Sequence, residues 1–143
     1  MAILSYSGGM RERVLNIWLE GNLQAHPFLP ASYWRGHREA VGLALQEAQV
    51  FVYEEEGELL GFLGLAEGNY IAGIFVAQGS RGRGVGARLL AELKSRYAVL
   101  RLHVYEKNER AVAFYRRQGF FETGREVEPD TGEREIAMEW RKV

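Results

Sequence analysis

A short glycine-rich stretch, QGSRGRGVGARLL at residues 78–90, is the segment of this sequence best suited to chemistry. Gly82, Gly84 and Gly86 occupy alternate positions, and an aliphatic helical pattern follows them. Glycines let a backbone approach a ligand closely, and a helix N-terminus exposes N–H groups and a partial positive charge. The stretch therefore predicts an anion site, with pyrophosphate as the natural ligand. A surface loop with glycines as turn residues is the simpler alternative.

Two common phosphate-binding motifs account for this stretch less well. A P-loop needs Gly-Lys-Ser/Thr at its end, but Gly86 is followed by Ala-Arg, which excludes that motif. The dinucleotide fingerprint fits Gly82, Gly84 and Ala87, with Glu106 as the ribose-binding acid. Two observations oppose it. The first glycine does not follow the predicted strand directly, and the chain after Glu106 is too short to complete a doubly wound sheet.

A second pattern, NERAVAFYRRQGF at residues 108–120, follows the glycine-rich stretch. The two patterns resemble the signatures of the Gcn5-related N-acetyltransferase (GNAT) family, in the order and at the distance found there. Arg81-x-x-Gly84-x-Gly86 resembles the acetyl-CoA signature, and N-x-x-A-x-x-x-Y-x-x-x-G-F resembles the second. The resemblance extends over residues 50–121. The stretch GNLQAHPFLPASYW is also similar to a group of small bacterial members, some of which act on protein lysines.

The resemblance implies an α/β fold with a mixed, mostly antiparallel central sheet flanked by about four helices. Hydrophobic periodicity agrees with it. The pattern predicts strands at 2–6, at 70–77, at 98–105 and in the C-terminal tail, and two more strands within 49–68 that a tight turn near Glu56-Gly57 joins. It predicts helices at 11–23, around 41–48, after Gly84 and from Asn108 to Gly119. The predicted order is β α α β β β α β α β β. Residues 1–143 are expected to form a single acetyl-CoA-dependent N-acetyltransferase domain.

On this resemblance, acetyl-CoA is the cosubstrate, and the strand before the glycine-rich stretch splays from its neighbour. The strand before the glycine-rich stretch pairs with the pantetheine arm, and the amides from Gly82 to Ala87 hold the pyrophosphate. Asn108 lies near the cofactor arm and is also a good helix N-cap. The residues expected on the cofactor side are Ile74, Phe75, Val76, Arg81, Gly82, Arg83, Gly84, Val85, Gly86, Ala87, Asn108 and Tyr115.

Tyr115 is the predicted catalytic acid, because the family places a proton donor at the matching position. Attack of an amine on a thioester expels a thiolate, and a tyrosine with a pKa of about 10 is protonated at neutral pH and able to supply a proton. A tyrosine that simply packs on the sheet is the alternative. Direct transfer between acetyl-CoA and the acceptor is expected, with no covalent enzyme intermediate and no metal.

The attacking amine must lose a proton, so a base or a water relay is also expected. His103, on the polar face of its strand, and Glu67, in the turn before the third strand, are the two candidates. Their alternatives are a structural histidine and a solvated turn carboxylate. The wall of the acceptor groove is expected to include His26, Phe28, Tyr33 and Tyr105, for which a buried aromatic cluster is the alternative.

The amino-acid composition limits the classes of partner and of chemistry that are expected. The formal net charge of −1 does not favour nucleic acid or an anionic membrane. The absence of cysteine excludes disulfides and thiolate chemistry, and the three histidines show no metal-ligand spacing. The sequence has neither an apolar run of about 20 residues nor a signal-peptide pattern, so a cytoplasmic protein is expected.

An amine on a small molecule, a protein lysine or a protein N-terminus is the expected acceptor. The sequence does not choose among these amines, nor does it determine the oligomeric state. A catalytically silent CoA- or nucleotide-binding sensor module is the alternative function.

Overall fold

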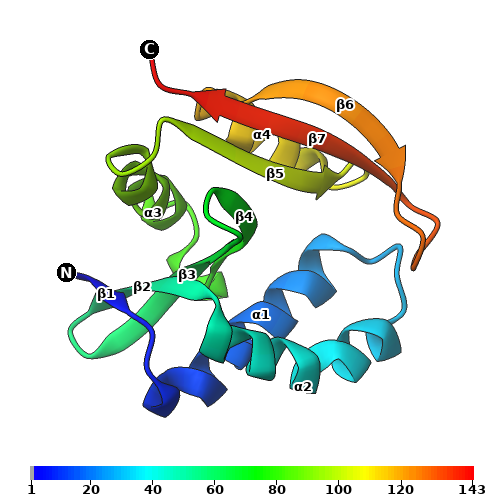
Figure 1. Cartoon of the computed structure of the whole chain (residues 1–143). Coiled ribbons are helices and arrows are strands. Elements are labelled where there is room, and N and C mark those ends of the chain that lie inside the picture. Colours follow the sequence, from blue (N-terminus) through cyan, green and yellow to red (C-terminus); the bar gives the residue numbers. More distant parts are fainter. Residues whose placement is uncertain (1) are drawn as a thin grey trace.

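The computed structural model describes residues 2–143, and within them seven strands form one sheet that four α-helices cover (Figure 1). The predicted order of strands and α-helices is confirmed, with two short 3-10 helices added. The elements are β1 (Ala2–Ser5), η1 (Gly8–Met10), α1 (Arg11–Ala25), α2 (Ala31–Glu47), β2 (Gln49–Glu55), β3 (Glu58–Ala66), β4 (Tyr70–Val76), η2 (Gln78–Ser80), α3 (Val85–Lys94), β5 (Val99–Tyr105), α4 (Glu109–Arg117), β6 (Phe121–Val127) and β7 (Arg134–Arg141).

The strands lie in the order β1-β2-β3-β4-β5-β7-β6. The sheet is antiparallel except at its centre, where β4 and β5 run parallel. These two strands pair only through Tyr70 with Arg101 and Ile71 with Leu102. Beyond those pairs they diverge, and Figure 1 shows the β5–β7–β6 half turned away from the β1–β4 half. The sheet is therefore split along its middle. It is not the doubly wound parallel sheet that a dinucleotide fingerprint requires.

Each face of the sheet has its own hydrophobic core, because side chains alternate along the strands. Val50 and Val52 of β2 pack in the core under α1 and α2. Phe51 and Tyr53 pack in the opposite core, which α3 and α4 cover. The register shifts where β3 meets β4, so that Ala72 lies between two paired residues. This bulge changes which β4 side chains face each core.

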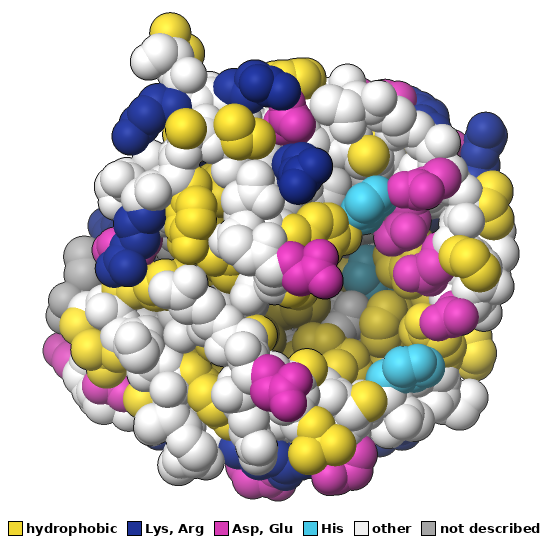
Figure 2. All heavy atoms as spheres, in the orientation of Figure 1, with side chains coloured by type: hydrophobic (Ala, Val, Ile, Leu, Met, Phe, Trp, Pro, Cys, Tyr) yellow, Lys and Arg dark blue, Asp and Glu magenta, His cyan; other side chains and the backbone are white. Residues whose placement is uncertain are grey.

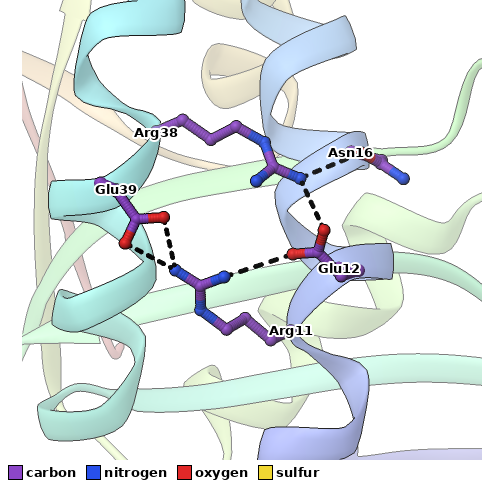
Figure 3. Close-up of polar contacts among 5 residues, drawn as sticks. All are labelled: Arg11, Glu12, Asn16, Arg38 and Glu39. Carbon is purple, nitrogen blue, oxygen red and sulfur yellow. Dashed lines mark hydrogen bonds and ion pairs between the residues drawn. The ribbon is translucent and has the colours of Figure 1, made fainter.

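A network of charged side chains joins α1 to α2 (Figure 3). The Arg11 guanidinium donates to both carboxylate oxygens of Glu39 at 3.2 Å and to Glu12 at 3.3 Å. Arg38 donates to Glu12 and Asn16. The carboxylates of these pairs are exposed, so each pair adds little to stability. Of the helices in residues 2–143, none has the length and apolar character needed to cross a membrane.

Both ends of α4 follow the sequence expectation. The Asn108 side chain accepts a hydrogen bond from the Ala111 N–H, which caps the helix N-terminus. At the other end Gly119 adopts a φ of 95°, and the Gly119 and Phe120 amides donate to the carbonyls of Arg116 and Tyr115. This pair of bonds is the Schellman motif, which a glycine at that position permits.

Candidate active site

A groove of about 910 Å³ runs between the end of α1, strand β4, the glycine-rich stretch and α4. This volume is near the upper end of the range for pockets that bind small molecules and cofactors. Every residue predicted for the cofactor side lines this groove except Arg83. The groove lies where β4 and β5 have separated, so the β4 backbone beyond Ile71 has no strand paired on that side. An extended ligand is able to take the place of the missing strand.

The three glycines of the stretch serve two different structural purposes. Gly82 and Gly84 adopt left-handed φ values of 80° and 79°, which a residue with a Cβ rarely takes. Gly86 lies inside α3, where an added Cβ would come within 3.2 Å of the Phe114 ring. The first two glycines bend the backbone before the N-terminus of α3, and the third lets α3 and α4 approach closely. Unpaired amides at this N-terminus are suited to an anion.

The arginines around the glycines are placed unequally. Arg81 lines the groove. Arg83 pairs with Glu55 at 2.8 Å, and Arg88 donates to the Tyr53 hydroxyl at 2.6 Å. Two of the three cations near the stretch therefore tie it to β2.

Tyr115 lies on α4, lines the main groove and is 8% exposed. Burial, and secondarily the nearby Tyr70, raise the pKa of Tyr115 well above its ordinary value. Its hydroxyl is therefore protonated at neutral pH, as a proton donor must be. The ring also packs edge-on against Phe114 and Phe120. Packing on the sheet and lining the groove are thus both features of this tyrosine.

His26 connects the end of α1 to the start of α4 across the split. The Asn22 amide nitrogen donates to the Trp18 carbonyl, so its oxygen accepts from His26 Nδ1 at 3.0 Å. The Asn108 oxygen already accepts from Ala111, so its nitrogen donates to His26 Nε2 at 3.1 Å. His26 is therefore neutral with both nitrogens bonded. Burial lowers the pKa of His26 to about 4, in agreement with this arrangement.

The residues predicted for the acceptor wall form an aromatic cluster around His26. Its ring stacks on Trp34 at a centroid distance of 5.2 Å and meets Tyr105 edge-on at 4.9 Å. Phe28 contacts Tyr105, and Tyr33 contacts Trp34. His26 and Phe28 also line the cofactor groove, whereas Tyr33 and Tyr105 do not. Contact of these four residues with an acceptor stays a prediction.

His103 is hydrogen-bonded on both sides by residues of other strands. The Tyr70 hydroxyl lies 2.8 Å from its Nδ1, and Glu126 Oε1 lies 2.7 Å from its Nε2. These three residues come from β4, β5 and β6. Neither Tyr70 nor Glu126 stands out in the sequence, because 33 and 23 residues separate them from His103.

Carboxylates gather beside His103 on the hairpin of β6 and β7. Glu126 and Glu135 are paired in register, and Glu128 accepts a 2.7 Å hydrogen bond from the Tyr105 hydroxyl. Burial and then the charge of Glu128 raise the pKa of Glu135. Figure 2 shows a hollow with a hydrophobic floor on this face, with acidic and histidine side chains along its right-hand rim. We use the name acidic rim for Glu126, Glu128 and Glu135, which are grouped by their contacts with His103, Tyr105 and one another.

Glu67 lies apart from these groups. It occupies the turn between β3 and β4 with a φ of 43° and is exposed. It lines a second hollow of about 400 Å³ against the end of α2, which shares no lining residue with the main groove. Its predicted role as the base has no geometric support comparable to that of His103.

Comparisons with known proteins agree with the fold. Residues 31–142 match the model of the acetyltransferase (GNAT) domain. YiaC of Escherichia coli K12, a peptidyl-lysine N-acetyltransferase, is 44% identical over 108 residues, which are 75% of this chain and 74% of YiaC. The solution structure of apo YjaB from Escherichia coli has a TM-score of 0.86 and 30% identity, over 97% of this chain and 96% of YjaB.

This chain belongs to the GNAT family. A more distant structure, the PaiA N-acetyltransferase of Thermoplasma acidophilum in complex with coenzyme A, is 16% identical with a TM-score of 0.78, covers 99% of this chain and 100% of its own, and shows the shared fold alone. The family assignment predicted from the two signatures is confirmed.

As a GNAT protein, the chain is an acyltransferase that moves an acetyl group to an amine. The family uses acetyl-CoA as the acetyl donor. Nothing in the comparisons supports a silent sensor module. The acceptor is an amine-bearing substrate, and its finer class depends on the groups around the split in the sheet.

Proposed function

We propose that this protein transfers the acetyl group of acetyl-CoA to the ε-amine of a lysine in a peptide or protein. The observation that carries the proposal is the split between β4 and β5, with Tyr115 in the lining of the main groove and a group of carboxylates on the β6–β7 hairpin beside His103. The relatives YiaC and YjaB, which are peptidyl-lysine N-acetyltransferases, support the choice of lysine.

The main groove fits acetyl-CoA in its donor groups. The amides from Gly82 to Ala87, turned by two left-handed glycines at the start of α3, are suited to the pyrophosphate. The β4 backbone at Ile74 and Val76 offers hydrogen-bonding groups to the pantetheine arm. When bound, acetyl-CoA supplies an activated acetyl group as a thioester. Asn108 caps the N-terminus of α4 and is hydrogen-bonded to His26, and these two bonds fix the part of the groove wall that faces the pantetheine arm.

Tyr115 holds a proton for the thiolate that leaves when the amine attacks. Its buried hydroxyl stays protonated because an anionic phenolate is costly in that position. A donor placed at this point contributes about 100- to 10,000-fold to the rate. The role needs no change of the protein backbone, since Tyr115 already lines the groove.

The acidic rim supports a cationic acceptor. A lysine side chain carries a positive charge at neutral pH and is attracted to the negative potential of Glu126, Glu128 and Glu135. The raised pKa of Glu135 reflects mutual repulsion among these carboxylates in addition to burial. An ammonium group near the rim would relieve that repulsion. A neutral or anionic acceptor would gain no such stabilisation.

The same rim makes a base necessary, because a negative potential holds the proton on the ammonium more firmly. His103 is at the rim, and Glu67 is in the separate hollow near α2. We therefore assign the proton-accepting role to the His103 side of the split.

Competition among amines tests this function. The protein is incubated with acetyl-CoA and an equimolar mixture of a lysine peptide with a blocked N-terminus, the same peptide with a free N-terminus and arginine in place of lysine, and spermidine. Mass spectrometry then locates the acetyl group. We expect acetylation of the lysine peptide to dominate. Preferred acetylation of the N-terminus or of spermidine would contradict the lysine assignment and leave acetyl transfer intact.

A further inference from the structure

The two ring nitrogens of His103 are both engaged within the protein. Tyr70 Oη lies 2.8 Å from Nδ1, and Glu126 Oε1 lies 2.7 Å from Nε2. An acceptor amine therefore has no free nitrogen of this ring to contact. If His103 takes the proton, the proton reaches it through one of its two partners.

The direction of the hydrogen bonds identifies that partner. An ionised Glu126 only accepts, so His103 Nε2 carries a hydrogen and donates to it. In the neutral ring Nδ1 then has a lone pair and accepts from the Tyr70 hydroxyl. Tyr70 Oη is left with lone pairs that face away from the ring. It is the member of the chain able to accept a proton from outside and pass on its own.

Tyr70 also lies at the split in the sheet, outside the lining of the main groove. It begins β4 at the narrow end of the split, where β4 and β5 still pair. After burial, Tyr70 is the second contributor to the raised pKa of Tyr115, so the two side chains are near each other. Burial, and then the charges of Glu135 and Glu126, raise the pKa of Tyr70 itself. At neutral pH the Tyr70 hydroxyl is thus protonated and able to donate to His103.

We propose that Tyr70 takes the proton from the acceptor ammonium and passes its own proton to His103, which Glu126 orients and stabilises as a cation. The inference rests on the proposed function, because it requires a protonated amine as the acceptor. Tyr70 is a catalytic residue in this scheme, since it touches the amine. Glu126 is a positioning residue that acts through His103.

The protons balance as follows. The ammonium N–H bond breaks toward Tyr70 Oη as the Tyr70 O–H bond breaks toward His103 Nδ1, and His103 becomes a cation beside the Glu126 carboxylate. The freed amine lone pair forms the bond to the acetyl carbon, and the carbon–sulfur bond breaks toward sulfur. Tyr115 gives its proton to the sulfur, and the second proton of the amine then reprotonates Tyr115. One proton in all leaves the site, from His103 to water.

The charges around His103 suit this transfer. Glu126 of β6 is bonded to Nε2 and Tyr70 of β4 to Nδ1, and Glu135 of β7 is near both His103 and Tyr70. Arg101 of β5 is the nearest cation along its own strand, and it donates to Asn69, away from the ring. Directly opposite His103 in the sheet are the small residues Ala137 and, next to it, Gly124. A cation on His103 is therefore formed among carboxylates.

The test compares two acceptors that differ only in whether they need a base. One is a lysine peptide, and the other is the same peptide with an aminooxy side chain of matched length, which is already neutral at neutral pH. Tyr70→Phe is expected to lower kcat for the lysine peptide about 100-fold, with an unchanged KM for acetyl-CoA. Its rate with the aminooxy peptide should stay within about 3-fold of the wild type, because the relay is then bypassed.

The pH profile gives a second readout. The defect of Tyr70→Phe with the lysine peptide should shrink as the pH rises toward about 10, where the lysine amine loses its proton without help. Glu126→Gln is expected to lower kcat about 10-fold and to move the low-pH limb of the profile. The effect is smaller than for Tyr70 because solvent reaches Glu126 and screens its charge.

Two variants control for the chemical changes themselves. Tyr97→Phe removes a hydroxyl that donates to Gln49 at 3.3 Å on the surface, and Glu122→Gln neutralises a carboxylate of the same strand β6 that pairs with Arg125. Both should leave the rates with the two peptides near those of the wild type. Thermal unfolding of each variant with and without acetyl-CoA shows that the fold and the donor site are retained.

Equal losses with both peptides in Tyr70→Phe, or no loss with either, would overturn the relay while leaving lysine acetylation in place. A wild-type protein that binds acetyl-CoA and acetylates no lysine peptide would overturn the proposed function and the relay together. The two failures are therefore distinguished by the wild-type rate alone.

Discussion

The two sides of the split in the sheet are built in different ways. The cofactor side consists of strand β4, the glycine-rich stretch and α4, and its predicted contacts are made largely by backbone groups. The acceptor side is assembled from α1, α2, the first residue of β4, strand β5 and the β6–β7 hairpin, and side chains make its contacts. The cofactor side thus offers backbone amides, and the acceptor side offers carboxylates, a histidine and tyrosines.

This difference predicts how each of the two substrates is recognised. Backbone amides are present whatever the side chains are, so the cofactor side depends on conformation, and glycines at positive φ provide it. The acceptor side depends on which side chains the fold brings together, and single substitutions change it. Changes on one side should therefore leave binding on the other side intact, unless they affect a residue that serves both.

Tyr115 is the proposed proton donor to the leaving thiolate, so its substitution should have the largest effect. Tyr115→Phe is expected to lower kcat by about 100- to 1,000-fold, because the leaving thiolate loses its proton donor. Acetyl-CoA should still raise the melting temperature, since the ring and its packing remain. Rates with the lysine and the aminooxy peptide should fall equally, in contrast to Tyr70→Phe. A rate near that of the wild type would exclude Tyr115 as the acid.

His26 joins the two sides structurally, and its substitution should affect stability. The pKa of His26 is about 4 in the folded protein, below the value of about 6.5 expected when unfolded. As the pH falls from about 6.5 to about 4, the unfolded chain takes up a proton that the folded protein does not. The free energy of unfolding should therefore decrease over this window by about 2 kcal/mol.

His26→Phe keeps an aromatic ring against Trp34 but cannot titrate or bond to Asn22 and Asn108. It should be less stable at neutral pH, by about 2 kcal/mol, and lose most of the decrease between about pH 6.5 and pH 4. Urea unfolding at several pH values measures both. His37→Gln, at an exposed histidine of α2, controls for loss of a histidine and should retain the decrease. An unchanged pH dependence in His26→Phe would refute the assignment.

Gly84 should affect the cofactor side alone. Gly84→Ala forces a Cβ into a φ of 79°, at a cost of about 1 to 2 kcal/mol, and shifting the loop to relieve it moves the amides. Affinity for acetyl-CoA, measured by calorimetry, is expected to fall about 10-fold.

Gly57→Ala is the matched control for Gly84→Ala. Gly57 has a φ of 77° in the turn between β2 and β3, with no atom near the position of an added Cβ. It should lower stability by a similar amount and leave acetyl-CoA affinity unchanged. Equal affinities in the two variants would show that the Gly84 conformation does not serve the donor.

Glu135 should affect the acceptor side alone, with the smallest change. Glu135→Gln removes one charge of the acidic rim, so KM for a lysine peptide is expected to rise about 2- to 5-fold at low salt. The rise should disappear at high salt, where the charges are screened. Stability should increase slightly, because burial and the repulsion from Glu128 make the charged form of Glu135 unfavourable. Glu92→Gln on α3 is a control distant from the rim.

The strand and helix order followed from patterns within short segments. Val85, Leu89, Leu90 and Leu93 have helical spacing and are buried in α3. Leu100, Leu102 and Val104 alternate in β5 and face the core. The turn at Glu56 and Gly57, with two positive φ values, was visible as a glycine turn. In each case the preference lies in residues a few positions apart.

The sequence by itself determined the glycine-rich turn, the cap and end of α4 and the family, because each depends on backbone preferences and spacing within one segment. Only the tertiary structure decided that Tyr70 meets His103, that Glu126 completes the chain and that His26 bonds to Asn108, 82 residues away. These contacts depend on which strands become neighbours in the sheet and where it splits. That order arises from burial of both faces of the whole sheet, and no local pattern contains it.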